Sequence, residues 1–153
     1  MVSAAKGTDQ TADDGSVELI PGMFGRDDDG RPVSLQGREC ERCGVRSYPP
    51  RRSCLACRSL ELRAVDLGKT GVVYSFGRAD MAMPGFEPGH LFGMVELDSG
   101  LLIYAQLEGA TYDELAVGDR VELVVGAVRR DAEGRGVLGP RFRPARHGRM
   151  TAP

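Results

Sequence analysis

Cys40-Glu41-Arg42-Cys43 and Cys54-Leu55-Ala56-Cys57 hold all four cysteines of the chain, and ten residues separate the two pairs. Each Cys-x-x-Cys pair can wrap a tight turn that aims two sulfurs at one point. The intervening segment needs to reverse direction only once, and Gly44 and Pro49-Pro50 favour that reversal. Four thiolates at Zn–S distances of about 2.3 Å complete a closed tetrahedral shell with no place for water or substrate. The pattern therefore predicts one structural zinc ion per chain, bound by Cys40, Cys43, Cys54 and Cys57.

Three other uses of these cysteines stay open. Disulfides need an oxidising compartment, and nothing at the N-terminus directs the chain to one. A rubredoxin-like site would bind iron through the same sulfurs, because ligand softness alone does not choose between iron and zinc. A thioredoxin-like redox motif needs a single reactive pair in a βαβ setting, so two closely spaced pairs argue against it.

The length of 153 residues allows one ordinary domain or two small ones. The cysteine hairpin is too small to hold a core without metal, so we expect two small units that share an interface. Residues 1–16 have almost nothing apolar to bury and predict a disordered tail. We expect the N-terminal segment and zinc ribbon at 17–66, a barrel at 67–146 and a flexible tail at 147–153. No internal repeat is apparent beyond the two cysteine turns.

Charge is distributed unevenly along a chain whose net charge is −2. Arginines crowd the cysteine segment, where Arg38, Arg42, Arg46, Arg51, Arg52 and Arg58 face only Glu39 and Glu41. A local basic patch on an acidic chain suits a small anionic ligand or a partner protein better than a long polyanion. No apolar run approaches twenty residues and no signal peptide is visible, so we expect a cytoplasmic protein without a membrane partner.

The short apolar stretch Val17-Glu18-Leu19-Ile20-Pro21-Gly22-Met23-Phe24 stands between two acidic segments. One interpretation is a strand or turn that packs on the chain's own core. The other is a docking segment for a second protein. The sequence leaves both open.

Alternation with a period of two predicts strands throughout the second half of the chain. Residues 91–97 and 101–107 alternate on either side of Asp98-Ser99-Gly100, which is typical of a β-hairpin. A short helix or turn follows at 112–115. Five short strands and one long first loop predict a Greek-key barrel of the OB type after the rubredoxin-like zinc ribbon, in a mainly β fold. The expected strands are 31–38, 45–48 and 60–65 in the ribbon, and 72–76, 91–97, 101–107, 121–127 and 137–142 in the barrel.

The sequence contains no recognisable catalytic motif. The two histidines are His90, in a loop, and His147, in the expected tail. A lone loop histidine is more often a solvated side chain than a base. No nucleophile elbow, P-loop or dinucleotide fingerprint occurs, so we predict no catalytic residue.

The loop 81–90 combines methionine and aromatic side chains with glycines and prolines. It joins the first two barrel strands, where OB proteins commonly engage ligands. Methionine and aromatic side chains on an exposed loop are typical of adaptable protein interfaces. The alternative is that they fold back over the barrel mouth. The candidate partner-binding residues are Met81, Met83, Phe86, His90 and Phe92.

The chain resembles a family of bacterial and archaeal proteins, a domain of unknown function, in which a rubredoxin-like zinc ribbon precedes an OB fold. Members accompany thiolases and related acyl-CoA enzymes. The matching features are Leu35-x-Gly37-x-x-Cys40-x-x-Cys43-Gly44, Tyr48-Pro49-Pro50-Arg51, Cys54-x-x-Cys57, Gly71-Val72-Val73-Tyr74-Ser75-Phe76 and Phe142-Arg143-Pro144. One departure is Arg58-Ser59 after the second turn, where a glycine is commoner.

The resemblance implies a non-catalytic accessory subunit in a hetero-oligomer with a thiolase-fold enzyme, such as a thiolase, acyltransferase or aldolase. The partner would supply the catalytic groups, while this subunit supports the active-site entrance and contacts CoA or acyl-CoA in the complex. Guanidinium groups bind phosphate in a bidentate way, so Arg46, Arg51 and Arg52 are the candidate CoA-binding residues.

The alternative function is binding of single-stranded nucleic acid, which zinc ribbons and OB barrels also serve. Tyr74, Phe76, Phe92 and Tyr104 would then be stacking platforms. Their spacing is that of strand core residues and the chain is acidic, so nucleic acid is the second choice. A rubredoxin-like electron carrier is a third interpretation, and its iron would colour the protein.

Overall fold

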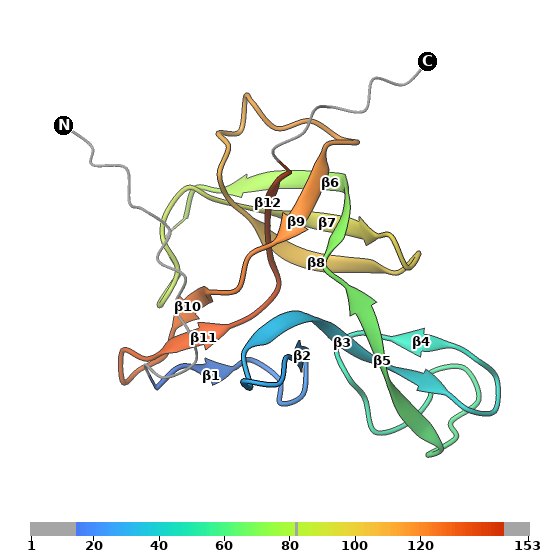
Figure 1. The fold of residues 1–153 in the computed structure, drawn as a ribbon. Helices are drawn as coiled ribbons and strands as arrows, with labels where there is room; N and C mark the ends of the chain where they lie inside the picture. Colours follow the sequence, from blue (N-terminus) through green and yellow to red (C-terminus); the bar gives the residue numbers. More distant parts are fainter. Residues whose placement is uncertain (1–14, 82, 146–153) are drawn as a thin grey trace.

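The computed structural model describes residues 15–81 and 83–145, and Figure 1 shows their arrangement. The tails expected at 1–16 and 147–153 lie outside the described residues, apart from Gly15 and Ser16. Every regular element in the described part is a β-strand, which confirms the mainly β class. Within that part, nothing resembles a helix that could cross a membrane.

Five strands close into a barrel in the order β12-β8-β7-β6-β9. Strand β12 pairs in parallel with β8 and antiparallel with β9, which closes the sheet on itself. This closed five-stranded barrel confirms the predicted OB fold. The strands are β6 (Thr70–Ala79), β7 (His90–Leu97), β8 (Leu102–Leu107), β9 (Arg120–Leu123) and β12 (Arg141–Pro144).

Strands β7 and β8 form the hairpin that alternation predicted. Leu91, Val95 and Leu97 of β7 are buried, while Glu96 is exposed. Ile103, Ala105 and Leu107 of β8 are buried in the same way. The Leu97 N–H donates to the Leu101 carbonyl at 2.9 Å, and Gly100 takes a φ of 88° that closes the turn.

Asp98 at this turn joins the hairpin to its neighbouring strands. Both terminal nitrogens of Arg120 donate to its carboxylate, at 2.7 and 2.9 Å, and the Thr70 hydroxyl contacts it as well. The hydrogen bonds from Arg120 and then Thr70 lower the pKa of Asp98 to about 2. The turn is thus held to β6 and β9 by a charged contact at the surface.

Replacing Asp98 with Asn is expected to weaken folding most at neutral pH. The folded pKa lies below the ordinary value, so the carboxylate stabilises the fold above about pH 4 and loses this effect as pH falls toward 2. The side chain is 51% exposed, so solvent screening keeps the loss below about 1 kcal/mol. Urea unfolding of wild type and Asp98→Asn at about pH 7 and about pH 3 measures it. Equal losses at both pH values would contradict this assignment.

The ribbon is built around β3 (Pro32–Cys40), which pairs with three other strands. Strands β2 (Phe24–Arg26) and β4 (Arg46–Ser47) pair with successive parts of β3, and β5 (Leu62–Gly68) pairs along most of its length. Strands predicted at 31–38, 45–48 and 60–65 are all present with shifted ends. Because β3 ends at Cys40, this strand positions the first of the four candidate metal ligands.

A third sheet, in the order β1-β11-β10, was not predicted. It consists of β1 (Val17–Glu18), β10 (Ala127–Arg130) and β11 (Gly136–Leu138). The single strand expected at 137–142 is wrong, because it divides into β11 and β12 at Gly139-Pro140. Proline lacks the N–H that a continuous ladder needs. The strand expected at 121–127 is likewise wrong, since β9 ends at Leu123 and β10 begins only at Ala127.

The second half of the N-terminal apolar stretch packs on the chain's own core, whereas Val17 and Leu19 in its first half are exposed. Met23 is 1% exposed and Phe24 is 3% exposed. Both belong to one apolar cluster that also contains Leu35 of the ribbon and barrel residues such as Phe142. Ribbon and barrel therefore share a core.

Two hairpin turns of identical design form an internal repeat that was not predicted. They are Arg26-Asp27-Asp28-Asp29-Gly30-Arg31 and Arg130-Asp131-Ala132-Glu133-Gly134-Arg135. In each, the aspartate Oδ1 accepts the N–H groups two and four residues later, at 2.8–3.0 Å. The leading arginine donates to the glycine carbonyl, at 2.7 and 3.0 Å. The shared pattern R-D-x-[DE]-G-R was the missed signal.

Candidate functional site

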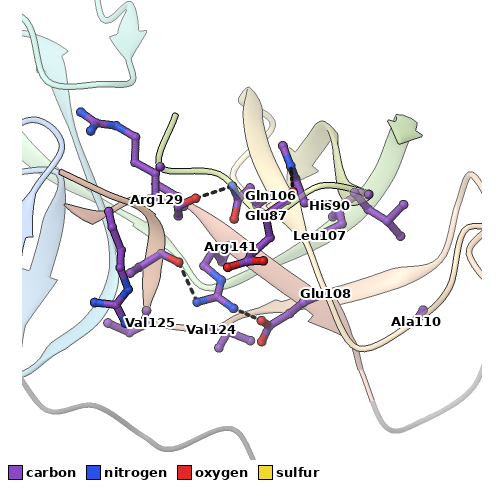
Figure 2. Close-up of a pocket in the computed structure, with 17 residues that line it drawn as sticks. Glu87, His90, Gln106, Leu107, Glu108, Ala110, Val124, Val125, Arg129 and Arg141 are labelled. Carbon is purple, nitrogen blue, oxygen red and sulfur yellow. Dashed lines mark hydrogen bonds and ion pairs between the residues drawn. The ribbon is translucent and has the colours of Figure 1, made fainter. Parts of the chain in front are cut away.

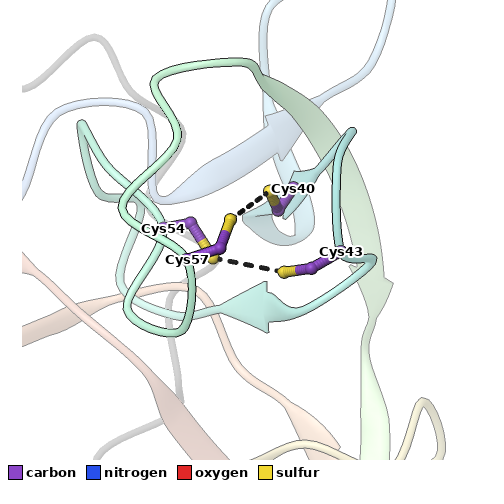
Figure 3. Close-up of side chains that lie close together, drawn as sticks. All are labelled: Cys40, Cys43, Cys54 and Cys57. Carbon is purple, nitrogen blue, oxygen red and sulfur yellow. Dashed lines mark hydrogen bonds between the residues drawn. The ribbon is translucent and has the colours of Figure 1, made fainter.

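The four cysteine sulfurs converge at the end of the ribbon, as Figure 3 shows. All four Sγ atoms lie within 4.8 Å of one another, with Cys40–Cys57 at 3.6 Å and Cys43–Cys54 at 3.5 Å. Sulfurs around a tetrahedral zinc ion are about 3.8 Å apart when each Zn–S bond is about 2.3 Å. Cys40 and Cys54 are buried, whereas Cys43 and Cys57 are exposed. The residues present therefore fit one tetrahedral metal ion.

Each cysteine pair is held by the same backbone turn. The Gly44 N–H donates to the Cys40 carbonyl at 2.9 Å, and the Arg58 N–H donates to the Cys54 carbonyl at 3.0 Å. The residue closing each turn has positive φ, 77° at Gly44 and 62° at Arg58. Glycine adopts this conformation freely, whereas another residue loses about 1 kcal/mol there. The departure noted in the sequence therefore places a strained arginine in the second turn.

Backbone N–H groups favour the thiolate form on both buried cysteines. Those of Cys57 and Ala56 lower the pKa of Cys54 to about 6, and that of Cys43 lowers the pKa of Cys40. At Cys43 the Val45 N–H acts in the same direction, but contact with Cys54 and burial raise its pKa to about 12. Like charges this close oppose one another, so all four thiolates need a cation between them.

The three arginines predicted for CoA lie in different settings. The Arg46 Nε–H donates to Glu39 at 2.6 Å, and Arg63 binds the same carboxylate. These bonds, first from Arg46 and then from Arg63, lower the pKa of Glu39. Arg51 and Arg52 are exposed on the loop before Cys54, and neither forms an ion pair with any residue that the structure describes. Their guanidinium groups stay available for a ligand.

The residues predicted for partner binding gather around the β6–β7 loop. Met81 is 82% exposed and Met83 is 64% exposed. The rings of Phe86 and His90 stack with centroids 5.4 Å apart, and His90 lies 6.2 Å from Phe92. The methionines are exposed, while the three rings form a half-buried row.

Tyr104 on β8 extends this aromatic row, with its ring centroid 5.9 Å from that of Phe92. The interpretation of Tyr74 and Tyr104 as strand core residues is wrong, because they are 58% and 59% exposed. A bulge between Val73 and Ser75 changes the phase of β6, and Val73 takes the core position. The outer face of the barrel is thus richer in aromatic surface than expected.

A pocket of about 580 Å³ lies beside the β6–β7 loop, between β8 and the segment from Val124 to Arg130 (Figure 2). Its position matches the surface of OB barrels that holds ligands, formed by the second and third strands and two loops. The Arg130 N–H donates to the Gly85 carbonyl at 3.0 Å, which joins the two loops. A side chain at Gly85 would lie 2.4 Å from the Arg130 carbonyl, so glycine permits this contact.

Arg141 forms the inner wall of the pocket in Figure 2. It contacts Glu108 and donates to the Ala127 carbonyl at 3.0 Å. Its Nε is buried and has no hydrogen-bond partner among the residues described. Arg141 was not predicted as a site residue, because a strand residue next to a tail carries no local signal in the sequence. The pocket is large enough for a small ligand.

Comparisons with known proteins find a matching family, similar sequences and a similar solved structure. Residues 64–126 match the family described as ChsH2, C-terminal OB-fold domain. Over 115 residues the chain is 36% identical to the benzoylsuccinyl-CoA thiolase subunit BbsA of Thauera aromatica, covering 75% of this chain and 79% of that protein. A DUF35 domain-containing scaffold protein of Methanothermobacter thermautotrophicus is 28% identical over 116 residues, covering 72% and 86%. The solved structure of the Ltp2-ChsH2(DUF35) aldolase has a TM-score of 0.60 and 30% identity, covering 72% of this chain and 84% of that chain.

Proposed function

The chain belongs to the DUF35 family of ChsH2-type OB-fold proteins, and from this we propose that it is a non-catalytic subunit of a hetero-oligomeric enzyme. The enzyme would be a thiolase, acyltransferase or aldolase acting on acyl-CoA. The partner subunit would supply the catalytic groups. This chain would support the entrance to the partner's active site and contact the shared acyl-CoA.

The observation that carries this proposal is the 36% identity to a thiolase subunit across 79% of that protein's length. The second support is the fold similarity to a chain of the Ltp2-ChsH2(DUF35) aldolase. Both relatives are described by their relation to an enzyme, and each match covers more than two thirds of this chain.

We assign zinc to the four-cysteine cluster as a structural ion. Its four sulfurs would fill the coordination shell, so the ion would link the two cysteine turns without touching substrate. Reduced thiols are required for this, which is why we propose the cytoplasm as the location. The Ala56 N–H, 3.4 Å from the Cys54 sulfur, would stabilise the bound thiolate further.

The partner contact is assigned to the exposed face of the β6–β7 loop. Met81 and Met83 offer flexible, exposed apolar side chains, and the aromatic row of the same loop adds half-buried ring surface. CoA contact is assigned to Arg51 and Arg52, whose guanidinium groups can bind phosphate in a bidentate way. Arg46 is the weakest of the three candidates for CoA binding, because its guanidinium already forms an ion pair with Glu39.

Recovery from native cell extract tests the proposal. The tagged full chain is purified under mild conditions, and the proteins that accompany it are identified. The mixture, the chain alone and the accompanying protein alone are then assayed for acyl-CoA turnover. We expect a thiolase-fold enzyme in the mixture and no turnover by the chain alone. Turnover by the isolated chain, or no such companion, would refute the proposal.

Reversing both charges in Arg51→Glu/Arg52→Glu is expected to raise the KM of the complex for acyl-CoA roughly tenfold or more, because two phosphate contacts become repulsive. The subunits should remain associated. Steady-state kinetics and co-purification measure the two effects. Arg31→Glu/Lys69→Glu reverses the same number of charges away from the cysteine turns and should leave KM unchanged. Unaltered KM in the Arg51/Arg52 variant would exclude these residues from CoA binding.

Single-stranded nucleic acid is the second candidate, and the exposed ring of Tyr104 beside Phe92 favours it. Bases stack on such rings in other OB folds. Salt-dependent retention on single-stranded DNA that falls in Tyr104→Ala would support this function. Passage of the wild-type chain through the DNA column at low salt would exclude it.

A further inference from the structure

The second cysteine turn presents two leucines to solvent with an arginine between them. Leu55 is 65% exposed and Leu60 is 77% exposed, and Arg58 is exposed as well. Hydrogen bonds from Arg58 N–H to the Cys54 carbonyl and from Cys54 N–H to the Ser59 carbonyl, at 3.0 and 2.9 Å, hold them on one small turn. We call Leu55, Arg58 and Leu60 the knuckle surface.

Arg58 occupies a backbone position that suits glycine. Of the residues that the structure describes, it is the one non-glycine residue with positive φ, and Gly44 takes the equivalent place in the first turn. Its guanidinium forms no hydrogen bond or ion pair with any other described residue. The positive φ closes the second cysteine turn, but the arginine side chain adds no such contact inside the described part of the protein. A strained arginine at a position where glycine would close the turn without cost points to a use for the side chain outside the chain.

The charge around the knuckle surface limits what can bind there. From Arg38 to Arg63 the sequence has seven arginines and three glutamates. A zinc ion with four thiolates adds about −2, so this segment remains positive. Two of the arginines, Arg46 and Arg63, are occupied by Glu39. The remaining positive charge lies in the same segment as the two exposed leucines, which is complementary to an acidic surface with an apolar centre.

Protein fits this surface better than nucleic acid. Single-stranded nucleic acid is held by stacking on exposed aromatic rings as well as by positive charge. Between Pro32 and Gly68 the sequence has one aromatic residue, Tyr48, and its ring packs against the core. Leucine offers no stacking face, whereas a buried leucine beside an arginine is a common arrangement in protein interfaces.

We propose that the knuckle surface docks on an acidic, apolar-centred patch of the enzyme subunit, with Arg58 as its central contact. This inference rests on the proposed function, since the occupant is the partner named there. Figure 1 places the β6–β7 loop and the end of the ribbon on opposite sides of the view. The knuckle surface is therefore a second contact, separate from the loop, and the two together would hold one partner at two points.

Arg58→Gly provides a test in which stability and binding move in opposite directions. Glycine relieves the positive φ, so the melting temperature of the full chain should rise by a few degrees. Its affinity for the co-purified enzyme subunit, measured by titration calorimetry, should fall at least tenfold. Replacing a residue with only a structural role would not raise the melting temperature and lower the affinity at the same time. Leu60→Ser, at an exposed position, should also lower affinity without lowering the melting temperature.

Two controls complete the test. Arg31→Gln removes one positive charge from a distant turn and should leave the affinity unchanged. Arg58→Lys retains charge and strain and should recover part of the affinity lost in Arg58→Gly. If Arg58→Gly binds the enzyme subunit as wild type does, this inference is wrong while the proposed function stands. If Arg58→Gly loses retention on single-stranded DNA instead, nucleic acid is the occupant. If no enzyme subunit co-purifies, both proposals fail together.

Discussion

Cys40→Ser and Cys57→Ser are each expected to lose the metal ion and unfold the ribbon. Binding of a structural zinc ion in small modules is worth about 10–16 kcal/mol, and in such modules it is inseparable from folding. Strands β3 and β5 meet the two cysteine turns, and both turns are too short to hold without the ion. Metal analysis should give about one zinc per wild-type chain and little in either variant. Thermal unfolding should lose the transition of the ribbon.

Ala56→Ser is the matched control, because Ala56 is exposed in the same turn and its change leaves all four thiolates in place. Its zinc content and melting curve should match those of wild type. Full zinc content with an unchanged melting curve in Cys40→Ser would exclude the cluster as a metal centre. An absorbing, coloured wild-type protein would show iron in place of zinc and revive the rubredoxin-like interpretation.

Gly93→Ala is expected to destabilise the barrel by about 3 kcal/mol or more. Gly93 is buried in β7 opposite Phe76 of β6, next to the bulge at Val73 and Ser75. An added Cβ would stand 2.0 Å from the Ser75 carbonyl oxygen and 2.8 Å from the Phe76 Cα. Both neighbours are backbone, so the two strands would have to separate. The midpoint of urea unfolding measures the loss.

Gly77→Ala on the paired strand serves as the control for this substitution. There an added Cβ meets the Phe92 ring at 3.2 Å, and a half-buried ring can move by a few tenths of an ångström. We expect Gly77→Ala to lower the free energy of unfolding, derived from the urea midpoint, by less than about 1 kcal/mol. If Gly93→Ala were as mild as Gly77→Ala, the close approach of β6 and β7 at the bulge would be refuted.

The local signals in the sequence were reliable. The cysteine spacing predicted which four sulfurs converge, and alternation predicted β7, β8 and the turn between them. Each of these features depends on neighbours within a few residues or on one short hairpin. The closed barrel followed because the number and order of strands leave few ways to bury their apolar faces.

What the sequence could not reveal depends on contacts between distant segments. Strand β1 pairs with β11, and no pattern near Val17 indicates a partner near Val137. The exposure of Tyr74 follows from the bulge between Val73 and Ser75, which the alternation of residue types does not show. The strain at Arg58 was visible only as an unusual residue after the second turn, and its φ came from the structure.

The parallel pairing of Val17 with Val137 has a consequence for how the chain reaches its native state. During synthesis, β1 cannot pair until the chain as far as Leu138 has left the ribosome. A topology that joins early and late segments has high contact order, which slows folding. Fragments cut between ribbon and barrel would each expose part of the cluster that holds Met23, Leu67 and Phe142. We therefore expect neither half to be a faithful substitute for the intact chain.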